Sequence, residues 1–428
     1  MINLGQSVLI AGFAREGQST LRYLLKHYPH LNIAVADVNP TAVKDLSYQT
    51  FSGPNYLSHL HQFDTVIRSP GISRQQLASA RQITTAINLF MAACPGMTIG
   101  VTGTKGKSTT SALIHHFLKT AKLDTQLVGN IGTPALDFLE QIHPKTHVVI
   151  ELSSYQLADL QFSPHLAVIL PISEEHLSYH GDFAAYVEAK KQIVIRQTAA
   201  DYVVYHAHNH QAQAIAQASK GQKIAYAATL DLPSFIPPRD QIPLLGRANL
   251  ENILAAAAVA QILNIKPYVL TQALKSFKPL PHRLEPIGTY QGITFYNDSL
   301  STTPVATLHA LEALGPKVAT LIAGGFDRGL DYSELGAVLA QSKLQTLLLL
   351  PDTGPRLQAT ILTAQPHPQL TMMPVQSMAQ AVQLAFKHTP KGQICLLSPA
   401  AASFNLFKDY VDRGNTFKRL VQTYSQVK

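Results

Sequence analysis

The sequence predicts an α/β protein made of three successive domains, and three observations support this prediction. Short apolar runs alternate with longer amphipathic segments, which is the pattern of parallel strands joined by helices. The length of 428 residues allows two to four domains. The alternation starts again after residues 92 and 285, and prolines at 279 and 281 support the second boundary. We therefore expect domains at 1–92, 93–285 and 286–428.

The first expected domain consists of buried strands and a helix. A glycine-containing turn separates the first strand from the helix, and an acid, Asp37, ends the second strand. Since strands that alternate with helices pair in parallel, we expect a parallel sheet here. The expected strands are residues 7–12, 32–37 and 63–71, and the expected helix is 19–28.

The other two expected domains repeat this pattern. The central domain opens with the strand "MTIGVTG", which runs into a glycine-rich turn. Its helix at 249–263 carries apolar residues on more than one face, so we expect it to be well buried. Further strands are expected at 146–152 and 165–172 in the central domain, and at 292–298, 318–325, 346–351 and 393–399 in the last domain.

The composition favours a globular protein that handles small anions. The chain carries 34 Lys and Arg against 26 Asp and Glu, a net charge of +8, without any basic run. Nucleotides explain this charge at least as well as nucleic acid does, so we expect no nucleic-acid partner. The two cysteines, Cys94 and Cys395, exclude a disulfide framework and a cysteine-rich metal site. Short apolar runs and the lack of a signal peptide predict a cytoplasmic protein without a membrane anchor.

The stretch "IGVTGTKGKSTT" at 99–110 predicts a binding site for a nucleotide phosphate. Its glycines let the backbone wrap closely, so that N–H groups face the phosphate oxygens; they are Gly100, Gly103 and Gly106. Lys107 would pair with the β and γ oxygens, and the Ser108 hydroxyl would bind Mg²⁺. Val101 stands where a standard Walker loop has glycine. The candidate ATP-binding residues of this loop are Gly103, Thr104, Lys105, Gly106, Lys107, Ser108 and Thr109.

The turn "GFAREGQST" is a weaker nucleotide signal near the N-terminus. Gly12 and Gly17 match two glycines of the dinucleotide fingerprint G-x-G-x-x-G, but Ala14 replaces the middle one. Asp37 lies about twenty residues further on, where a ribose-binding acid would lie. A nicotinamide-dependent dehydrogenase, another nucleotide site and an empty tight turn all remain open on these residues.

Two further residues are candidates for metal binding. Glu151 ends an apolar strand, where open parallel sheets bind ligands, and its carboxylate could complete an Mg²⁺ shell. A strand-end glutamate is also a common helix cap or surface acid. His176 precedes a predicted helix that carries the adjacent lysines Lys190 and Lys191. Alone, such a histidine more often has no ligand.

In this order, these segments resemble the Mur ligase family, the ATP-dependent amino-acid ligases of peptidoglycan synthesis. The resemblance covers nearly the whole chain and is specific because ten motifs occur in register. The motifs are "SPGI", "GVTGTKGKST", "GNIG", "ELSSYQL", "EEHLSYHG…EAKK", "GRANLENILAA", "PHRLE", "YNDSLSTTP", "GGFDRGLDY" and "LSPAAASFNLFKDYVDRGNTF".

The resemblance implies three domains with distinct tasks and one reaction. A Rossmann-like N-terminal domain would hold a UDP-linked substrate, a central P-loop-type sheet would hold ATP with Mg²⁺, and a Rossmann-like C-terminal domain would bring the amino acid. The implied reaction adds D-glutamate to UDP-N-acetylmuramoyl-L-alanine through an acyl phosphate. L-glutamate is the first alternative, and a folylpolyglutamate synthase-like ligase or a nucleotide-binding regulatory module is a weaker one. The family also implies a monomer.

The resemblance further assigns roles to individual residues. The implied metal ligands are Ser108, Glu151, His176 and a carbamylated Lys190. The implied catalytic residues are Lys107, Glu151, His176 and Lys190. Besides the loop, ATP would contact Asn252, Arg283 and Asp298. The implied UDP-substrate site comprises Gly12, Phe13, Ala14, Arg15, Glu16, Gly17, Asp37, Ser69, Pro70, Gly71, Asn130, Ser153 and Gln156. The implied glutamate site comprises Thr302, Arg328, Ser403, Phe404 and Tyr410.

The glutamate site departs from the commonest family pattern. Leu300 replaces a lysine and Thr303 an asparagine in "NDSLSTTP", and Arg328 stands where many members have lysine. Arginine offers a planar fork for a carboxylate, whereas lysine is a point charge. The sequence therefore leaves both D-glutamate and L-glutamate open.

Overall fold

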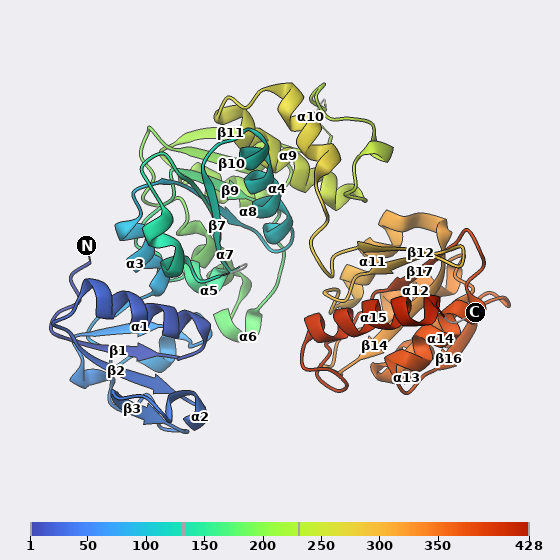
Figure 1. Ribbon diagram of the computed structural model, residues 1–428, viewed down its shortest axis with the longest axis horizontal. Coiled ribbons are helices and arrows are strands. Elements are labelled where there is room, and N and C mark those ends of the chain that lie inside the picture. Colours follow the sequence, from blue (N-terminus) through green and yellow to red (C-terminus); the bar gives the residue numbers. More distant parts are fainter. Residues whose placement is uncertain (1, 131–132, 230–231, 427–428) are drawn as a thin grey trace. The chain divides into compact units, whose positions relative to one another are not determined.

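The computed structural model describes residues 2–130, 133–229 and 232–426, which form two compact units. The first unit comprises Met1–Pro237 and Glu251–Leu274, and the second comprises Pro238–Leu250 and Lys275–Lys428. The first unit contains an N-terminal and a central sheet, and the second contains a C-terminal sheet. These sheets confirm the predicted α/β class (Figure 1). The three domain ranges themselves stay a prediction.

The N-terminal sheet is five-stranded and parallel, in the order β3-β2-β1-β4-β5. Its strands are β1 (Ser7–Ala11), β2 (Asn32–Asp37), β3 (Gln49–Ser52), β4 (Thr65–Arg68) and β5 (Ile83–Thr84). Its helices are α1 (Arg15–His27), α2 (Pro40–Val43) and α3 (Ala86–Ala93), with 3-10 turns at Leu60–Gln62 and Arg74–Leu77. The three expected strands are confirmed, and the helix begins four residues earlier than expected.

The central sheet is six-stranded and parallel, in the order β11-β10-β9-β6-β8-β7. Its strands are β6 (Met97–Thr102), β7 (Thr125–Gly129), β8 (His147–Glu151), β9 (Leu166–Ile169), β10 (Tyr202–His206) and β11 (Gln222–Tyr226). The helices are α4 (Lys107–Thr120), α5 (Ser154–Leu157), α6 (Leu177–His180), α7 (Phe183–Lys191), α8 (His210–Gln217), α9 (Arg247–Ile262) and α10 (Pro267–Ser276). A 3-10 turn occurs at Ala135–Gln141, and another, Arg239–Gln241, belongs to the second unit.

Strand β6 occupies the functional position in the central sheet. From β6 the chain passes first to β7 and β8 on one side and then to β9, β10 and β11 on the other side. This change of direction makes the carboxyl end of β6 the switch point, where open parallel sheets bind ligands. Helix α9 is buried at every residue from Asn252 to Ala260, as its apolar sequence predicts.

The C-terminal sheet has the order β12-β13-β17-β14-β15-β16, and all its pairs are parallel except the hairpin of β12 and β13. Its strands are β12 (Glu285–Tyr290), β13 (Ile293–Asn297), β14 (Val318–Gly325), β15 (Thr346–Asp352), β16 (Thr371–Pro374) and β17 (Ile394–Leu397). Its helices are α11 (Pro304–Leu314), α12 (Ser333–Gln341), α13 (Thr353–Thr363), α14 (Met378–His388) and α15 (Tyr410–Ser425), with a 3-10 turn at Gly315–Lys317.

The C-terminal sheet is buried on both faces. Alternate residues of β15 belong to different clusters: Leu347 packs with α12 and α13, whereas Leu348 packs with α14 and α15. This alternation follows from the two-residue period of a strand. Both cysteines are free, Cys395 in this core and Cys94 half-buried.

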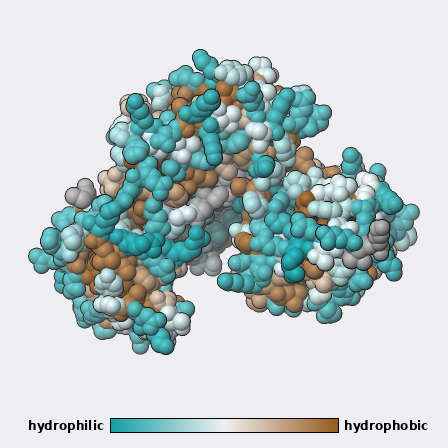
Figure 2. Space-filling model, viewed as in Figure 1, coloured by the Kyte–Doolittle hydropathy of each residue, from teal (hydrophilic) through white to brown (hydrophobic). Residues whose placement is uncertain are grey.

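The surface of each unit is mixed in hydropathy. On the face shown in Figure 2, hydrophilic residues cover most of each unit and hydrophobic residues form separate patches. Among the described residues, no helix combines the length and the apolar character needed to cross a bilayer.

Candidate functional site

The glycine-rich stretch forms the turn between β6 and α4, as predicted. Gly103 and Gly106 adopt φ angles of +155° and +85°, which favour glycine. A Cβ at Gly103 would lie 2.5 Å from the Leu170 Cβ, and one at Gly106 would lie 2.2 Å from the Asn252 Oδ1. The turn therefore depends on both glycines, and the N-terminus of α4 places its N–H groups and partial positive charge beside it.

Gly100 has a different role from the one expected. It lies inside β6, where a Cβ would meet the Pro164 Cγ at 2.7 Å. The expectation that Gly100 helps to wrap a phosphate is wrong, because its small size serves the packing of the strand.

Cationic and hydroxyl side chains surround the turn. The Lys107 Nζ donates to the carbonyl oxygens of Gly103 (3.0 Å) and Thr104 (2.9 Å), so this side chain folds over the turn. The Thr104 hydroxyl accepts from the Ser173 N–H at 2.9 Å, which ties the turn to the segment after β9. Lys105 is exposed and forms an ion pair with Glu175. The turn thus carries two lysines, whose positive charge suits a polyphosphate.

Lys190 is buried, whereas its neighbour Lys191 is not. The Lys190 side chain is 1% exposed, and its Nζ donates to the Gly103 carbonyl at 2.9 Å and lies 4.6 Å from the centre of the Tyr186 ring. Burial, and then the nearby charge of Lys107, hold the pKa of Lys190 well below its usual range. Lys191 instead pairs with the exposed Glu188 at 3.2 Å. A lysine that is held neutral can react with carbon dioxide to form a carbamate, so Lys190 has the required environment.

His176 lies beside the same group of cations. Its backbone is left-handed (φ +59°) at the start of α6, and its ring centre lies 5.0 Å from that of Tyr155. Desolvation lowers the pKa of His176, and the charges of Lys107, Lys105 and Lys190 lower it further, although Glu175 opposes them. The imidazole is thereby favoured in its neutral form, which is the form that binds metals.

Glu151 ends strand β8 in a buried position close to the phosphate turn. It is the last residue of β8, is 2% exposed, and pairs in register with Val101 just before the phosphate turn. Its Oε1 accepts from the Asn130 Nδ2 at 2.9 Å, while its Oε2 is buried without a hydrogen-bond partner among the described residues. An orphaned carboxylate oxygen is costly unless a cation neutralises it, so Glu151 fits a metal ligand.

The structure brings several residues of the expected UDP-substrate site around a cavity of about 200 Å³. The predicted residues that line it are Arg15, Glu16, Pro70, Asn130 and Gln156. The sequence did not predict its remaining lining residues, which are Ser19, Ala86, Ile87, Gly129, Pro134, Ala135 and Leu136. Burial raises the pKa of Glu16 to about 7, partly opposed by the charge of Arg68.

Other expected UDP-substrate residues hold the N-terminal turn together. The Phe13 N–H donates to the Asp37 Oδ2 at 2.6 Å, and the Ser69 hydroxyl donates to the Gly12 carbonyl at 3.0 Å. A Cβ at Gly17 would lie 2.2 Å from the Gly12 oxygen, which explains the second glycine. Ala14 and Gly71 lie in the same two loops, at the start of α1 and after β4. The Asp37 carboxylate already has a backbone donor in this turn.

Ser153 and Asn252 also have partners within the protein. Ser153 caps α5 in a reciprocal arrangement with Gln156, whose side chain accepts from the Ser153 N–H at 3.1 Å. The Asn252 Oδ1 accepts from the Thr110 hydroxyl at 3.2 Å, immediately behind the phosphate turn. The expected contacts of these residues with substrate and adenine stay predictions.

In the second unit, Asp298 and Arg283 lie close to each other. Asp298 is buried and accepts from the Ser398 hydroxyl (2.8 Å) and the Leu284 N–H (3.1 Å). Burial raises its pKa to about 6, while these hydrogen bonds and the charge of Arg283 act in the opposite direction. Asp298 therefore organises the start of this unit, and its contact with a ribose stays a prediction.

The expected glutamate residues lie on loops that follow strands of the C-terminal sheet, except Tyr410, which begins α15. Arg328 donates from Nη2 to the Thr302 carbonyl at 3.0 Å, which brings two of them together. Ser403 is buried, whereas Phe404 is 65% exposed. Tyr410 begins α15, and its carbonyl accepts from the Ser299 hydroxyl at 2.8 Å. The Phe404 ring packs edge-on against that of Phe326, with centres 6.1 Å apart, and is otherwise largely open to solvent.

Comparisons with known proteins identify the family. Residues 101–232 match the Mur ligase middle domain, and residues 282–401 match the glutamate ligase domain of Mur ligases. The chain is 35% identical to the UDP-N-acetylmuramoyl-L-alanine--L-glutamate ligase of Xanthomonas campestris pv. campestris (strain 8004), over 97% of this chain and 95% of that protein. The chain belongs to the Mur ligase family. Members of this family form amide bonds with ATP, so the chain is a ligase.

Other Mur ligases extend the comparison. The UDP-N-acetylmuramoylalanine--D-glutamate ligase of Symbiobacterium thermophilum is 30% identical over 99% of each chain. The solved structure of the MurF ligase from Thermotoga maritima in complex with ADP aligns with a TM-score of 0.65 and 15% identity, over 98% of this chain and 95% of that one. The shared three-domain fold confirms the predicted architecture.

This Mur ligase also contains buried arginines that the sequence did not single out. Arg413 is fully buried, and its Nε donates to the Ser299 hydroxyl while its Nη1 donates to the Ala401 and Ala402 carbonyls. It joins two loops that carry expected glutamate residues. Phe417 lies one turn further on the same buried face of α15, and this spacing is the signal that could have identified Arg413.

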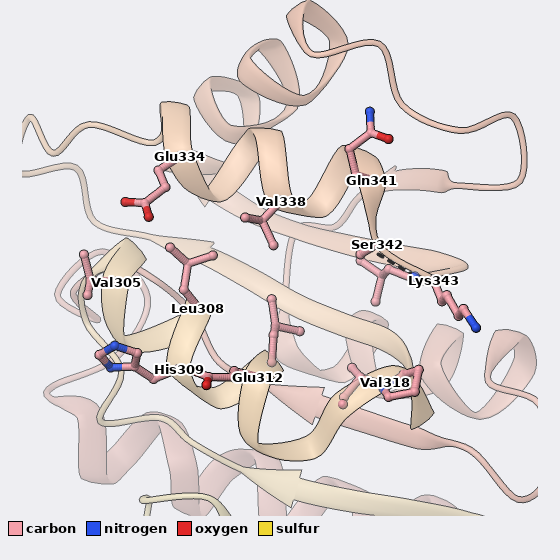
Figure 3. A pocket seen from close by; sticks show the side chains of 14 residues that line it. Val305, Leu308, His309, Glu312, Val318, Glu334, Val338, Gln341, Ser342 and Lys343 are labelled. Atoms are coloured by element: carbon pink, nitrogen blue, oxygen red, sulfur yellow. Dashed lines mark hydrogen bonds between the residues drawn. The ribbon is translucent and has the colours of Figure 1, made fainter. Parts of the chain in front are cut away.

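A second cavity of the Mur ligase contains no expected site residue. It has a volume of about 580 Å³ and lies between α11 and α12 in the second unit. Figure 3 shows apolar side chains such as Leu308 and Val338 facing it, with His309, Glu312 and Glu334 at its edges. Nothing in the structure shows what covers it, so we assign it no role.

Substituting Gly106 tests the geometry of the phosphate turn in this Mur ligase. Gly106→Ala forces a Cβ against the buried Asn252 Oδ1 at a positive φ, so we expect a loss of about 1–3 kcal/mol in the free energy of unfolding and weaker ADP binding. Gly53→Ala is the matched control, because Gly53 has a similar φ of +78° with open space around it. Urea unfolding and ADP titration measure both effects. Equal losses in the two variants, with ADP affinity unchanged, would contradict this role of Gly106.

Proposed function

We propose that this ligase joins D-glutamate to the alanine carboxylate of UDP-N-acetylmuramoyl-L-alanine in cytoplasmic peptidoglycan precursor synthesis, with ATP and Mg²⁺ and as a monomer. The observation that supports this most strongly is the group of cations at the phosphate turn, together with the Glu151 oxygen that has no hydrogen-bond partner in the described part of the chain. Relatives of the chain carry this substrate in their names. The dehydrogenase alternative has no support, because the chain aligns with ligases over almost its full length.

The proposed reaction must first bring two anions together. The substrate carboxylate attacks the γ-phosphorus of ATP, the bond to the β-phosphate oxygen breaks, and an acyl phosphate and ADP form. The Lys107 ammonium, held at the turn, neutralises the oxygens of the transferred group. The α4 N-terminus offers backbone N–H groups to the same phosphates. Positioning supplies much of the remaining rate, because little covalent chemistry is left to the protein.

The second step of the proposed reaction forms the amide. The neutral amine of glutamate attacks the acyl carbon, the tetrahedral intermediate expels phosphate, and the nitrogen loses a proton. Arg328 offers a planar fork for a glutamate carboxylate, and it already lies against Thr302. The residues Ser403, Phe404 and Tyr410 are proposed to complete this site.

The residues present fit the metal ions that the family implies. Ser108 and Glu151 would hold one Mg²⁺, and His176 with a carbamylated Lys190 would hold a second. When bound, these ions supply positive charge to the phosphate oxygens. The orphaned Glu151 oxygen and the lowered pKa values of Lys190 and His176 support this set. Among the described residues no group of three His, Cys, Asp or Glu side chains is placed to hold a metal ion, and the proposed ligand sets add a hydroxyl and a carbamate.

L-glutamate is the second candidate for the amino acid. The Xanthomonas relative at 35% identity is named for L-glutamate, and the Symbiobacterium relative at 30% is named for D-glutamate. Arg328 in place of the commoner lysine changes the group that would grip a glutamate carboxylate. The stereochemistry therefore needs a direct measurement.

Phosphate release tests the proposed function. With ATP, Mg²⁺ and UDP-N-acetylmuramoyl-L-alanine, we expect D-glutamate to stimulate release at least about tenfold more than L-glutamate, since a site built around paired carboxylates distinguishes enantiomers. UDP-N-acetylmuramate without alanine is the control for the acceptor. A stronger response to L-glutamate would establish the second candidate, and no release with either enantiomer would reject the ligation.

A further inference from the structure

We propose that Arg68 is a positioning residue that holds the UDP-substrate turn and the His176 segment in one geometry. The inference rests on the proposed function, because it concerns how that site is assembled. Arg68 is the last residue of β4 and immediately precedes the turn Ser69–Gly71. The sequence alone assigns Arg68 no role.

Arg68 is held by a buried ion pair. Its side chain is 0% exposed and that of Asp159 is 6% exposed. The Nε of Arg68 donates to the Asp159 Oδ2 at 2.7 Å, and Nη2 lies 2.6 Å from the same oxygen. A buried ion pair of this kind adds little net stability, but removing one partner leaves the other charge buried and uncompensated. Its value therefore lies in the geometry that it fixes.

On one side, Arg68 binds the backbone of the UDP-substrate turn. Its Nη1 donates to the carbonyls of Pro70 (3.1 Å) and Ile72 (2.7 Å). The Tyr179 hydroxyl lies 2.9 Å from the same nitrogen and donates to either of these carbonyls, at 3.1 and 3.2 Å. Pro70 lines the cavity of about 200 Å³ described above. Arg68 and Tyr179 thus set the path of one wall of this cavity.

On the other side, Arg68 binds the segments that carry the proposed metal ligands. Its Nη2 donates to the Tyr155 carbonyl at 2.7 Å, in the short helix that follows Glu151. The Tyr155 ring contacts the rings of His176 (centres 5.0 Å apart) and Tyr179 (4.3 Å). His176 therefore packs against the side chain of Tyr155, and Arg68 binds the backbone carbonyl of that same residue.

These contacts predict that one substitution disturbs two separate binding constants. Arg68→Lys keeps the charge, but a lysine lacks the fork that reaches the turn, Tyr155 and Tyr179 together. Both the turn and His176 would then lose their fixed positions. Small displacements of positioning groups have large kinetic effects, on the order of 100-fold for 1 Å.

Steady-state kinetics of three variants test this proposal. We expect R68K to raise the KM for UDP-N-acetylmuramoyl-L-alanine about tenfold and the Mg²⁺ concentration for half-maximal rate several-fold. We expect Y179F, which removes one hydroxyl, to raise both by less. The exposed Arg81, which lies 3.5 Å from Asp64, supplies the control R81Q, which should change neither constant.

The outcomes separate this role from a merely structural one. If R68K fails to fold by circular dichroism, Y179F decides alone. A folded variant in which both constants stay within twofold of wild type, or only one of them changes, would overturn the coupling. Failure of the wild-type enzyme to release phosphate would instead reject the proposed function, so the two failures are distinguishable.

Discussion

Lys107→Ala is expected to lower kcat at least about 1,000-fold, the largest effect of any substitution considered for this ligase. The Lys107 ammonium lies over the phosphate turn, bound to the Gly103 and Thr104 carbonyls, and is placed to neutralise the charge that develops on the transferred phosphoryl group. The substitution by alanine keeps the backbone of the turn intact but removes this positive charge. The measurement is ADP production with saturating substrates.

A lysine in the same helix provides the control for that experiment. Lys119 is exposed near the other end of α4, and Lys119→Ala should keep kcat within about twofold of wild type, as surface substitutions usually do. Circular dichroism should show both variants folded. A folded Lys107→Ala enzyme with near-normal turnover would contradict the role of the phosphate turn in catalysis.

Lys190→Ala is expected to lower kcat on the order of 100-fold and to raise the Mg²⁺ requirement, because it removes the proposed carbamate. Lys190 is buried with a lowered pKa, so its amine is available to react with carbon dioxide. Acetate or propionate in the assay should restore part of the activity by replacing the lost oxygen ligand. Removing carbon dioxide from the buffer should lower the activity of the wild-type enzyme.

The adjacent lysine provides a matched control for the carbamate. Lys191 is on the same helix but pairs with Glu188 at the surface, so Lys191→Ala should need no rescue. Mass spectrometry under mild conditions should detect an added mass on Lys190 only. Full activity of Lys190→Ala without a carboxylate would refute the carbamate, and rescue of Lys191→Ala in its place would assign it to the neighbouring lysine.

Much of the fold could be predicted because the strands of this chain are apolar and regularly spaced. The runs at β1, β6, β14 and β17 are buried on both faces, and such runs are visible in the sequence without knowledge of partners. Strand β3 was not predicted because "QTFS" is short, mostly polar and largely exposed at a sheet edge. Its strand conformation comes from pairing with β2, which is tertiary information.

The site residues likewise divide into those that the sequence could predict and those that only the structure could show. The phosphate turn could be predicted because its chemistry depends on neighbouring residues, whereas Gly100 was misassigned because only the structure shows Pro164 against it. The sequence alone does not distinguish Lys190 from Lys191 as the proposed carbamate. The structure distinguishes them, because Lys190 is buried against the Tyr186 ring. Arg68 could not be recognised from sequence, since its partner Asp159 is 91 residues away.

The central claim, that residues 103–109 bind the phosphates of ATP, is tested most directly by a crystal structure with a non-hydrolysable ATP analogue and Mg²⁺. We predict that the β and γ phosphates lie against the backbone N–H groups of Gly103–Thr109, with the Lys107 Nζ in contact with their oxygens. Triphosphate density elsewhere on the protein, with this turn free of phosphate, would contradict the claim.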